Sequence, residues 1–190
     1  MREKRFNLAN RLLHWSIAFT ILFLLLTVFL RSTWMDKNQI GDIVKNNLNK
    51  SNINLTDKDA ANIGRAVRRP MWQCHIYAGY VMIGLYVIRM IVTAIQGIAY
   101  KNPFTKGLSF KEKLKSWIYI IFYFLLTITL FTGFMVENGP KAWKDSMEFI
   151  HVKSLYFFIA FIIVHIVGVM IADAKEDRGI ISKIITGDEA

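Results

Sequence analysis

The stretch HVKSLYFFIAFIIVH, residues 151–165, places a histidine at each end of an apolar segment. In an α-helix, fourteen residues span about 21 Å and nearly four full turns, so His151 and His165 point in about the same direction. One helix face therefore presents two imidazole rings, one above the other. Because imidazole binds transition metals and haem iron, this spacing predicts two ligand sites stacked along one helix.

Four long runs with little or no charge provide the helices that carry the histidines. Residues 12–30, 116–136 and 154–172 contain no Asp, Glu, Lys or Arg, and residues 70–100 contain only Arg89. A helix needs roughly 20 residues to cross a bilayer, and no sheet fits runs of this length. We therefore predict one all-α domain, a membrane four-helix bundle over residues 1–190. Its helices are expected at about 12–30, 71–100, 116–136 and 150–172, with an extramembrane segment at 31–69.

The four histidines of the chain sort into two levels of this predicted bundle. His14 lies three residues into the first helix, and His165 lies deep in the last one, so both fall toward the inner side. His75 and His151 lie near the outer starts of their helices. Each level thus takes one histidine from the last helix and one from another helix. Ionisable residues inside a membrane are uncommon, and chance would rarely pair all four by depth.

Two imidazoles at each level suit a haem, whose large apolar ring belongs between membrane helices. Zinc is the main alternative, but two ligands with no carboxylate or thiolate beside them make a poor zinc site. The WQCH stretch ends like a c-type attachment sequence, yet Met71 stands where a second cysteine is needed before Cys74. The pattern therefore predicts two non-covalent haem b groups stacked across the bilayer. With both axial positions filled, such iron carries electrons and does not readily bind a substrate.

A net charge of +10 raises the question of nucleic acid. Membrane proteins also concentrate Lys and Arg next to the bilayer, so we expect contact with membrane lipid and no nucleic acid. Lys and Arg are denser in residues 1–11 and 101–115 than in 31–69 and 137–153. The positive-inside rule then places both termini in the cytoplasm. We expect the first helix to be retained, because residues 31–34 offer no small-residue cleavage site.

The extramembrane segment 31–69 contains a further helix signal in TDKDAANIGRAVRR. Thr56 is expected to cap this helix, and Asp57 and Asp59 in its first turn favour the positive end of the helix dipole. Pro70 is expected to end it before the second membrane helix begins.

Arg89 is the only charge inside a predicted membrane run, fourteen residues after His75 and hence on the same face near the inner level. It either binds a haem propionate or extends toward the inner headgroups, and both interpretations stay open. Gly79 and Gly168 each lie one turn from a histidine, and Gly133 lies near the outer end of the third helix. They leave room for a flat macrocycle or permit close helix packing equally well.

Three stretches, RLLHW at 11–15, HIYAGYVMIGLYVIR at 75–89 and HVKSLYFFIAFIIVH at 151–165, resemble the bacterial cytochrome b561 and nickel-iron hydrogenase b-type cytochrome family. That family includes the membrane gamma subunits of formate dehydrogenases. The resemblance covers all four helices. It implies two b haems, with quinone reacting beside the inner one, and it places the family's arginine of the second helix on Arg89. The haem ligands it implies are His14 with His165 and His75 with His151.

Three functions are consistent with these observations. The first is a dihaem cytochrome of the bacterial inner membrane that passes electrons, in a respiratory chain, between the quinone pool and a redox partner. That partner is a hydrogenase or dehydrogenase subunit or a c-type cytochrome, and whether the chain is itself an enzyme stays open. The second is a stand-alone superoxide:ubiquinone oxidoreductase, in which basic residues steer the anion or, equally, dock an acidic partner. The third is a haem-free membrane anchor. The basic residues in question are Arg65, Arg68, Arg69 and Lys153.

Overall fold

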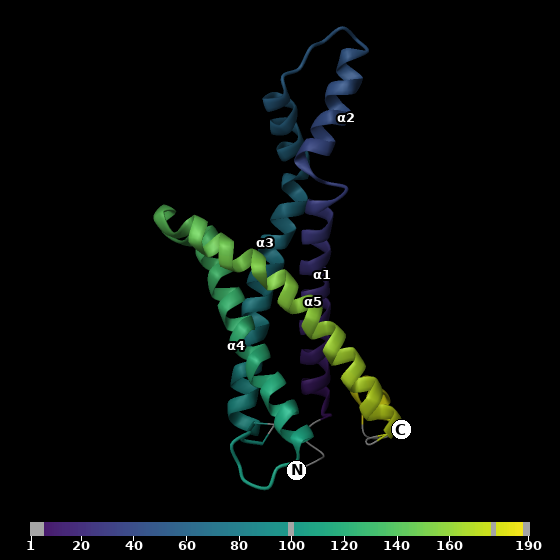
Figure 1. The fold of residues 1–190 in the computed structure, drawn as a ribbon, viewed down its shortest axis with the longest axis vertical. Helices are drawn as coiled ribbons and strands as arrows, with labels where there is room; N and C mark the ends of the chain where they lie inside the picture. Colours follow the sequence, from purple (N-terminus) through teal and green to yellow (C-terminus); the bar gives the residue numbers. More distant parts are fainter. Residues whose placement is uncertain (1–5, 99–100, 176–177, 188–190) are drawn as a thin grey trace. The chain divides into compact units, whose positions relative to one another are not determined.

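The computed structural model describes residues 6–98, 101–175 and 178–187. In chain order the elements are α1 (Leu8–Ser32), α2 (Lys37–Asn49), α3 (Asp57–Gln96), α4 (Phe110–Asn138), the single-turn 3-10 helix η1 (Lys141–Trp143), α5 (Lys144–Lys175) and α6 (Ile180–Thr186) (Figure 1). The described residues contain no β-strand. Helices α1, α3, α4 and α5 are each long and apolar enough to cross a membrane. The predicted fold class, an all-α four-helix membrane bundle, is therefore confirmed.

The apolar side chains of these four helices are mostly exposed when the chain is considered by itself. Even in α1, which has the largest buried share, only 17% of the most apolar window is buried inside the protein. Phe19 and Phe124, for example, are 62% and 63% exposed. A soluble protein would rarely leave so much contiguous apolar surface in water. In a membrane, lipid hydrocarbon covers such surface, and the backbone groups of each helix are satisfied by hydrogen bonds within the helix.

The described residues divide into two compact units, which are treated separately: Ala18–Met82 and the segments on either side of it. In the first unit, α2 was not predicted from the sequence. Its N-cap is Asp36, whose carboxylate accepts hydrogen bonds from the backbone N–H groups of Asn38 at 2.8 Å and Gln39 at 3.3 Å. The hydrogen bond from the Asn38 N–H is the main cause that holds the pKa of Asp36 below its ordinary value, and the Gln39 N–H and the nearby positive charges of Arg68 and Lys37 act in the same direction.

Helix α3 begins at Asp57, and the predicted N-cap is present, since the Thr56 hydroxyl accepts from the Asp59 backbone N–H at 3.2 Å. The expectation that Pro70 ends this helix was wrong, because α3 continues through it. A proline has no N–H, so it removes one intrahelical bond, and the helical residues on both sides sustain the helix. The predicted end near residue 100 lies outside the described residues. The helix ends at Gln96, and Gly97 follows with φ +87°, which suits glycine.

Two glycines let α2 approach the first turns of α3 at backbone distance. A Cβ at Gly41 would lie 2.7 Å from the carbonyl carbon of Ala60, and a Cβ at Gly64 would overlap the Lys37 carbonyl. Both glycines are buried. The contact is backbone against backbone, so it cannot adjust by rotating a side chain.

The Gly64→Ala substitution is therefore expected to separate α2 from α3, at a cost on the order of 1–3 kcal/mol for an overpacked contact. Limited proteolysis should then cut residues 33–56 faster than in the wild type. Gly84→Ala in the same helix is the control, because no atom of the described residues lies within 4 Å of a Cβ there. Equal cleavage rates for the two variants would contradict the expectation.

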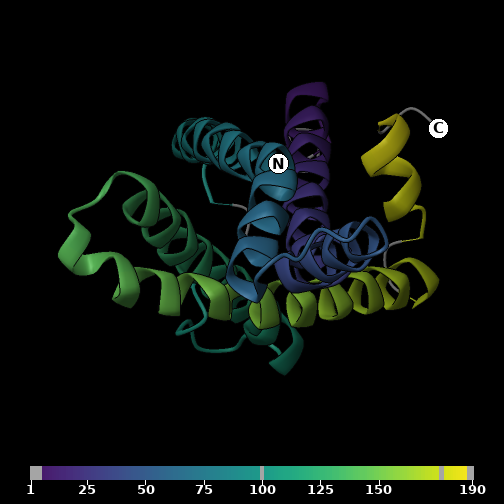
Figure 2. The same cartoon turned by 90° about the horizontal axis from the view of Figure 1, so that it is seen from above.

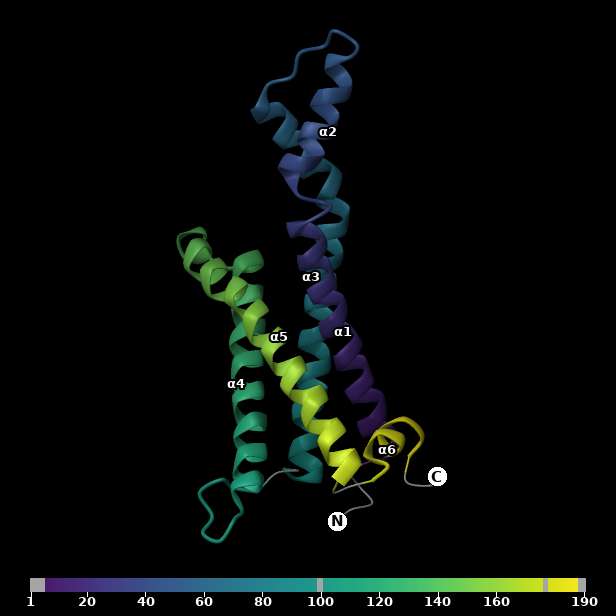
Figure 3. The same cartoon turned by 45° about the vertical axis from the view of Figure 1, so that its right-hand side comes forward.

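In the second unit, α4 packs against α5 after a tight reversal at η1, which Figure 2 shows from above. α5 also contacts α6, which Figure 3 shows beside the end of α5. α5 is one continuous helix from Lys144 to Lys175. The fourteen-residue spacing of its two histidines is therefore an uninterrupted helical spacing.

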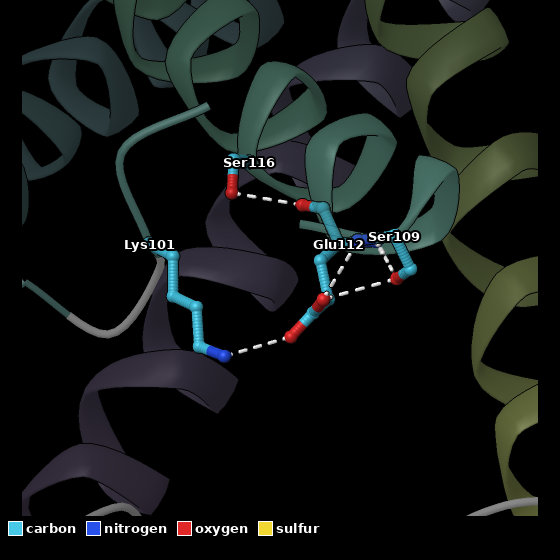
Figure 4. A network of polar contacts seen from close by, with 4 residues as sticks. All are labelled: Lys101, Ser109, Glu112 and Ser116. Carbon is cyan, nitrogen blue, oxygen red and sulfur yellow. Dashed lines mark hydrogen bonds and ion pairs between the residues drawn. The ribbon is translucent and has the colours of Figure 1, made fainter. Parts of the chain in front are cut away.

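α4 starts at Phe110, six residues before the apolar run at Ser116, because a capping box holds its first turn (Figure 4). The Ser109 hydroxyl accepts from the Glu112 N–H at 3.3 Å, and the Glu112 carboxylate accepts from the Ser109 N–H at 3.0 Å. Lys101 donates to the same carboxylate at 2.8 Å. The sequence carries this signal as Ser-Phe-Lys-Glu at 109–112.

The Lys101 ammonium and the Ser109 N–H and hydroxyl lower the pKa of Glu112 from 4.5 to about 2. Since the folded pKa is depressed, the stabilisation is present above about pH 4.5 and is lost as the pH falls toward about 2. Glu112→Gln is expected to speed hydrogen exchange of the first-turn amides of α4 at about pH 7, and the difference from wild type should vanish near pH 2. A difference that persists at the acid end would show that the carboxylate charge is not responsible.

Candidate functional site

His14 on α1 and His165 on α5, the pair predicted for the inner level, lie next to each other in the structure. Their ring centroids are 6.1 Å apart, and the planes are inclined by 44°. A bond from imidazole nitrogen to a transition metal is about 2 Å and each ring centre lies about 1 Å beyond its nitrogen, so two imidazoles on one ion have centroids about 6 Å apart. The observed separation matches that arrangement.

Two neighbours of His14 in the RLLHW stretch fix the start of α1 against α6 (Figure 3). Arg11 donates to the Ile185 carbonyl at 2.6 Å, and the Trp15 indole N–H donates to the Ile184 carbonyl at 3.1 Å. These carbonyls belong to the last turn of α6, where intrahelical donors are missing. Neither α6 nor this role of Arg11 and Trp15 was predicted from the sequence, because the contacts join residues about 170 positions apart.

Aromatic rings surround the His14–His165 pair. Phe161, one turn before His165 on α5, stacks on it with centroids 5.7 Å apart and planes 13° apart. Phe122 of α4 stacks on Phe161 in turn at 4.2 Å. Trp15 meets His14 edge to face at 5.6 Å. The apolar rings restrict both imidazoles and present a hydrocarbon environment around them.

His151 is held by the turn of α4 that contains Thr129, Thr132 and Gly133. Its Nδ1 lies 3.0 Å from the Thr129 carbonyl and 3.4 Å from the Thr132 hydroxyl. A carbonyl only accepts, so Nδ1 carries the proton and the lone pair of the neutral ring is on Nε2. A Cβ on Gly133 would lie 2.7 Å from His151 Cε1, so only glycine leaves this ring its place. The sequence pattern Thr-x-x-Thr-Gly in an apolar helix is the signal that could have identified this contact.

His75 on α3 has a similar restraint within the unit Ala18–Met82. Its Nδ1 lies 2.7 Å from the Thr27 hydroxyl oxygen. That hydroxyl donates to the Leu24 carbonyl at 2.6 Å, so its oxygen accepts from His75 Nδ1–H. The lone pair is again on Nε2. A hydrogen bond from the other ring nitrogen is what fixes a ligating histidine in metal sites.

Arg89 lies on α3, half-buried, in a polar network. Its Nε donates to the Tyr123 hydroxyl at 3.2 Å and its NH1 donates to the Asn10 side-chain oxygen at 3.1 Å. Asn10 donates in turn to Gln96 at 2.8 Å. These two bonds hold the guanidinium in place within the protein. A guanidinium has five donors, so this one retains capacity for an anion.

Two other glycines and four basic residues were singled out in the sequence, and the structure shows the surroundings of each group. No atom of the described residues lies within 4 Å of a Cβ built at Gly79 or at Gly168, so packing within this part of the chain does not require glycine there. Lys153 lies over the Phe149 ring at 5.3 Å. The three arginines proposed to steer an anion or dock a partner all lie on α3, before its apolar part: Arg65, Arg68 and Arg69.

The membrane-spanning helices thus carry one pair of imidazoles among aromatic rings, His14 and His165. Two further histidines, His75 and His151, have Nδ1 within hydrogen-bond distance of an oxygen acceptor. Such histidines are typical of membrane proteins that bind a prosthetic group through imidazole. The comparison with known families defines the class further. The chain belongs to the prokaryotic cytochrome b561 family, whose family model matches residues 5–187. It is therefore a multi-pass membrane protein of b-type haem electron transfer. No curated relative and no solved structure matched the chain.

Proposed function

We propose that the protein is a dihaem cytochrome b that passes electrons between the membrane quinone pool and a redox partner. His14 and His165 bind one haem, and His75 and His151 bind the other. The observation that carries the proposal is the 6.1 Å separation of the His14 and His165 rings, which suits two axial imidazoles on one iron.

The second ligand pair is supported by the chemistry of its rings and by sequence register. Both His75 and His151 have Nδ1 within hydrogen-bond distance of an oxygen acceptor, so both neutral rings carry their lone pair on Nε2. Their pairing follows from depth, since each lies near the outer start of its membrane segment. Within α5, His151 and His165 are about 21 Å apart along the axis, which suits electron transfer between two levels of the membrane.

Haem, when bound, supplies one-electron chemistry, and the chain determines what else can happen there. His14 with His165, and His75 with His151, would hold the two haems, and an iron held by two imidazoles would leave no ready site for oxygen or a substrate. The apolar helices exclude water from the site. Arg89, which donates hydrogen bonds to Tyr123 and Asn10, would hold an anionic group such as a propionate of the inner haem.

Quinone is proposed to react beside the inner pair, and the termini are proposed to be cytoplasmic. The redox partner is proposed to be a hydrogenase or dehydrogenase subunit or a c-type cytochrome, docking on the segment 31–69. The family resemblance supports the quinone, and the distribution of Lys and Arg supports the orientation. Helix α2 and the first turns of α3 give segment 31–69 a folded surface on which a partner can dock.

A superoxide:ubiquinone oxidoreductase is the second candidate. The observation that favours it is Arg31, whose guanidinium carbon lies 4.0 Å from the Trp72 ring, which stacks on His75. A cation beside an outer ligand would attract a small anion. Superoxide generated in solution should then reduce the purified protein at a rate that falls with ionic strength, whereas the carrier function predicts no such reduction.

The first experiment is a reduced-minus-oxidised absorption spectrum of the purified chain with haem counted per polypeptide. Two b haems support the proposal. One haem means that one histidine pair is misassigned. No haem, from cells able to supply it, would favour the membrane-anchor alternative, in which the histidines only bridge helices.

Replacing Arg89 tests its proposed role. Arg89→Gln removes a positive charge that favours the reduced haem, so one midpoint potential should fall by on the order of 60 mV, about 1.4 kcal/mol for one electron. Arg89→Lys keeps the charge and should show a smaller shift. Redox titration of both haems measures this. If Arg89 only extends toward the headgroups, neither potential should move.

A further inference from the structure

Two side chains of the unit Ala18–Met82, Trp72 and Thr27, contact His75, and a third, Arg31, contacts Trp72. Trp72, one turn earlier on α3, lies parallel to the imidazole, with ring centroids 4.5 Å apart and planes only 5° apart. The Arg31 guanidinium of α1 lies over the same indole, 4.0 Å from its centroid. Thr27, also on α1, lies 2.7 Å from His75 Nδ1. The imidazole is therefore restrained on its face and on its edge.

The two restraints act on different motions of the ring. The bond to Thr27, whose own hydroxyl proton goes to the Leu24 carbonyl, fixes where Nδ1 lies and which tautomer is present. A single hydrogen bond at the ring edge still allows the ring plane to rock. The indole, stacked within 5° of parallel, opposes that rocking. Of the two, only Trp72 acts on the plane of the ring.

The positive charge of Arg31 lies near His75 because Trp72 contacts both side chains. A guanidinium over an indole is a favourable cation–π contact, worth more where water is excluded. It keeps a positive charge next to the ring that contacts His75. Because Arg31 is in the last turn of α1, the helix dipole also favours a cation there.

We propose that Trp72 is a positioning residue that fixes the plane of the His75 imidazole for iron ligation, and that Arg31, seated on Trp72, raises the reduction potential of the haem bound there. This inference rests on the proposed function, in which His75 is an axial ligand. The plane of an axial imidazole sets its overlap with the iron d orbitals, and hence the anisotropy of the low-spin ferric EPR signal. A nearby positive charge favours the ferrous state.

An indole that only fills space would have a different signature. Its removal would lower thermal stability without changing one haem more than the other. A positioning indole instead changes the EPR signal and the potential of the single haem bound by His75. The two haems of one chain therefore act as internal references for each other.

The test uses the full chain, purified with its haems, in four variants: Trp72→Leu, Trp72→Phe, Arg31→Gln and Thr27→Val. Low-temperature EPR of the oxidised protein and redox titration of both haems are measured alongside haem per chain. Trp34→Leu is the matched control, since it removes another tryptophan of the same unit that is 77% exposed.

The expected results have opposite signs at two of these positions. Arg31→Gln should lower one of the two midpoint potentials, because it removes a positive charge. Thr27→Val should raise the same potential, because an imidazole whose N–H donates to an acceptor is more electron-rich and favours ferric iron. Trp72→Leu should shift the largest g value of the low-spin ferric EPR signal of that haem alone. Trp72→Phe, which keeps an aromatic ring, should keep most of the wild-type signal. The control should match the wild type.

Two outcomes would overturn the proposal. One is an unchanged EPR signal and an unchanged midpoint potential in Trp72→Leu. If that variant cannot be purified, an unchanged midpoint potential in Arg31→Gln overturns the proposal. The other is an equal change at both haems. His75→Ala separates this result from failure of the proposed function: a full haem content in that variant removes His75 as a ligand, whereas loss of one haem keeps it and leaves only the stack in question.

Discussion

Replacing His165 with alanine is expected to lower the haem content of the purified chain by about half. The remaining partner, His14, would then offer one imidazole to a haem that needs two, and the aromatic surroundings of the pair offer no replacement ligand. The absorbance of the reduced-minus-oxidised spectrum should fall in proportion. The surviving haem should keep its midpoint potential, because its proposed ligand on α5, His151, is about 21 Å from His165 along that helix.

Val164→Ala is the matched control for this experiment. Val164 precedes His165 on α5 and is 50% exposed, so shortening it changes the lipid-facing surface and leaves the pair intact. His151→Ala should lose the other haem, and the double variant should lose both. Full haem content in His165→Ala would contradict the ligand assignment at the inner level. Yield of the folded chain in the membrane must be measured in parallel, so that failed insertion is not mistaken for haem loss.

The membrane helices are the feature that the sequence predicted best. Uncharged runs are a strong signal, since a bilayer tolerates few charges in its interior. The fourteen-residue gap between His151 and His165 needs only helix geometry to be interpreted. The depths of His14 and His165 in their helices put both at the inner level, and in the structure their ring centroids are 6.1 Å apart. That the two residues bind a haem stays a prediction.

Features that depend on contacts between distant segments could not be read in the same way. Helix α2 has a clear N-cap in Asp36, but its short length and polar composition gave a weak signal beside the membrane runs. Pro70 looked like a helix end, although a single proline removes only one hydrogen bond. Thr27 and Trp72 attract no notice in the sequence, because hydroxyl and indole groups are ordinary in membrane helices. Their contacts with His75 give them their significance.

Gly133→Ala is expected to remove one haem while the helices stay folded. The added methyl group would lie 2.7 Å from Cε1 and 3.1 Å from Nδ1 of His151, and these are the nearest atoms to it. The backbone of α4 has no reason to move, because the His151 side chain can rotate away at low cost. That rotation breaks the hydrogen bond from Nδ1 to the Thr129 carbonyl, now 3.0 Å, and turns Nε2 away from its position.

The size of the effect follows from what the hydrogen bond does for a ligand. Loss of such an orienting partner weakens metal binding by about 10–100-fold, and here the ligand itself is displaced as well. Haem per chain should therefore fall toward half, as in His151→Ala. Circular dichroism and membrane yield should stay at wild-type values, since alanine is a better helix former than glycine.

Two glycines provide controls that share the substitution but not the contact. Gly84→Ala and Gly168→Ala also add a methyl group inside a membrane helix, yet no atom of the described residues lies within 4 Å of either position. Gly84→Ala should bind haem as the wild type does. Gly168→Ala lies one turn from His165, so haem loss there would mean that the bound macrocycle itself occupies the space beside that glycine. Retention of both haems in Gly133→Ala would instead show that His151 binds no haem in the orientation the structure gives it.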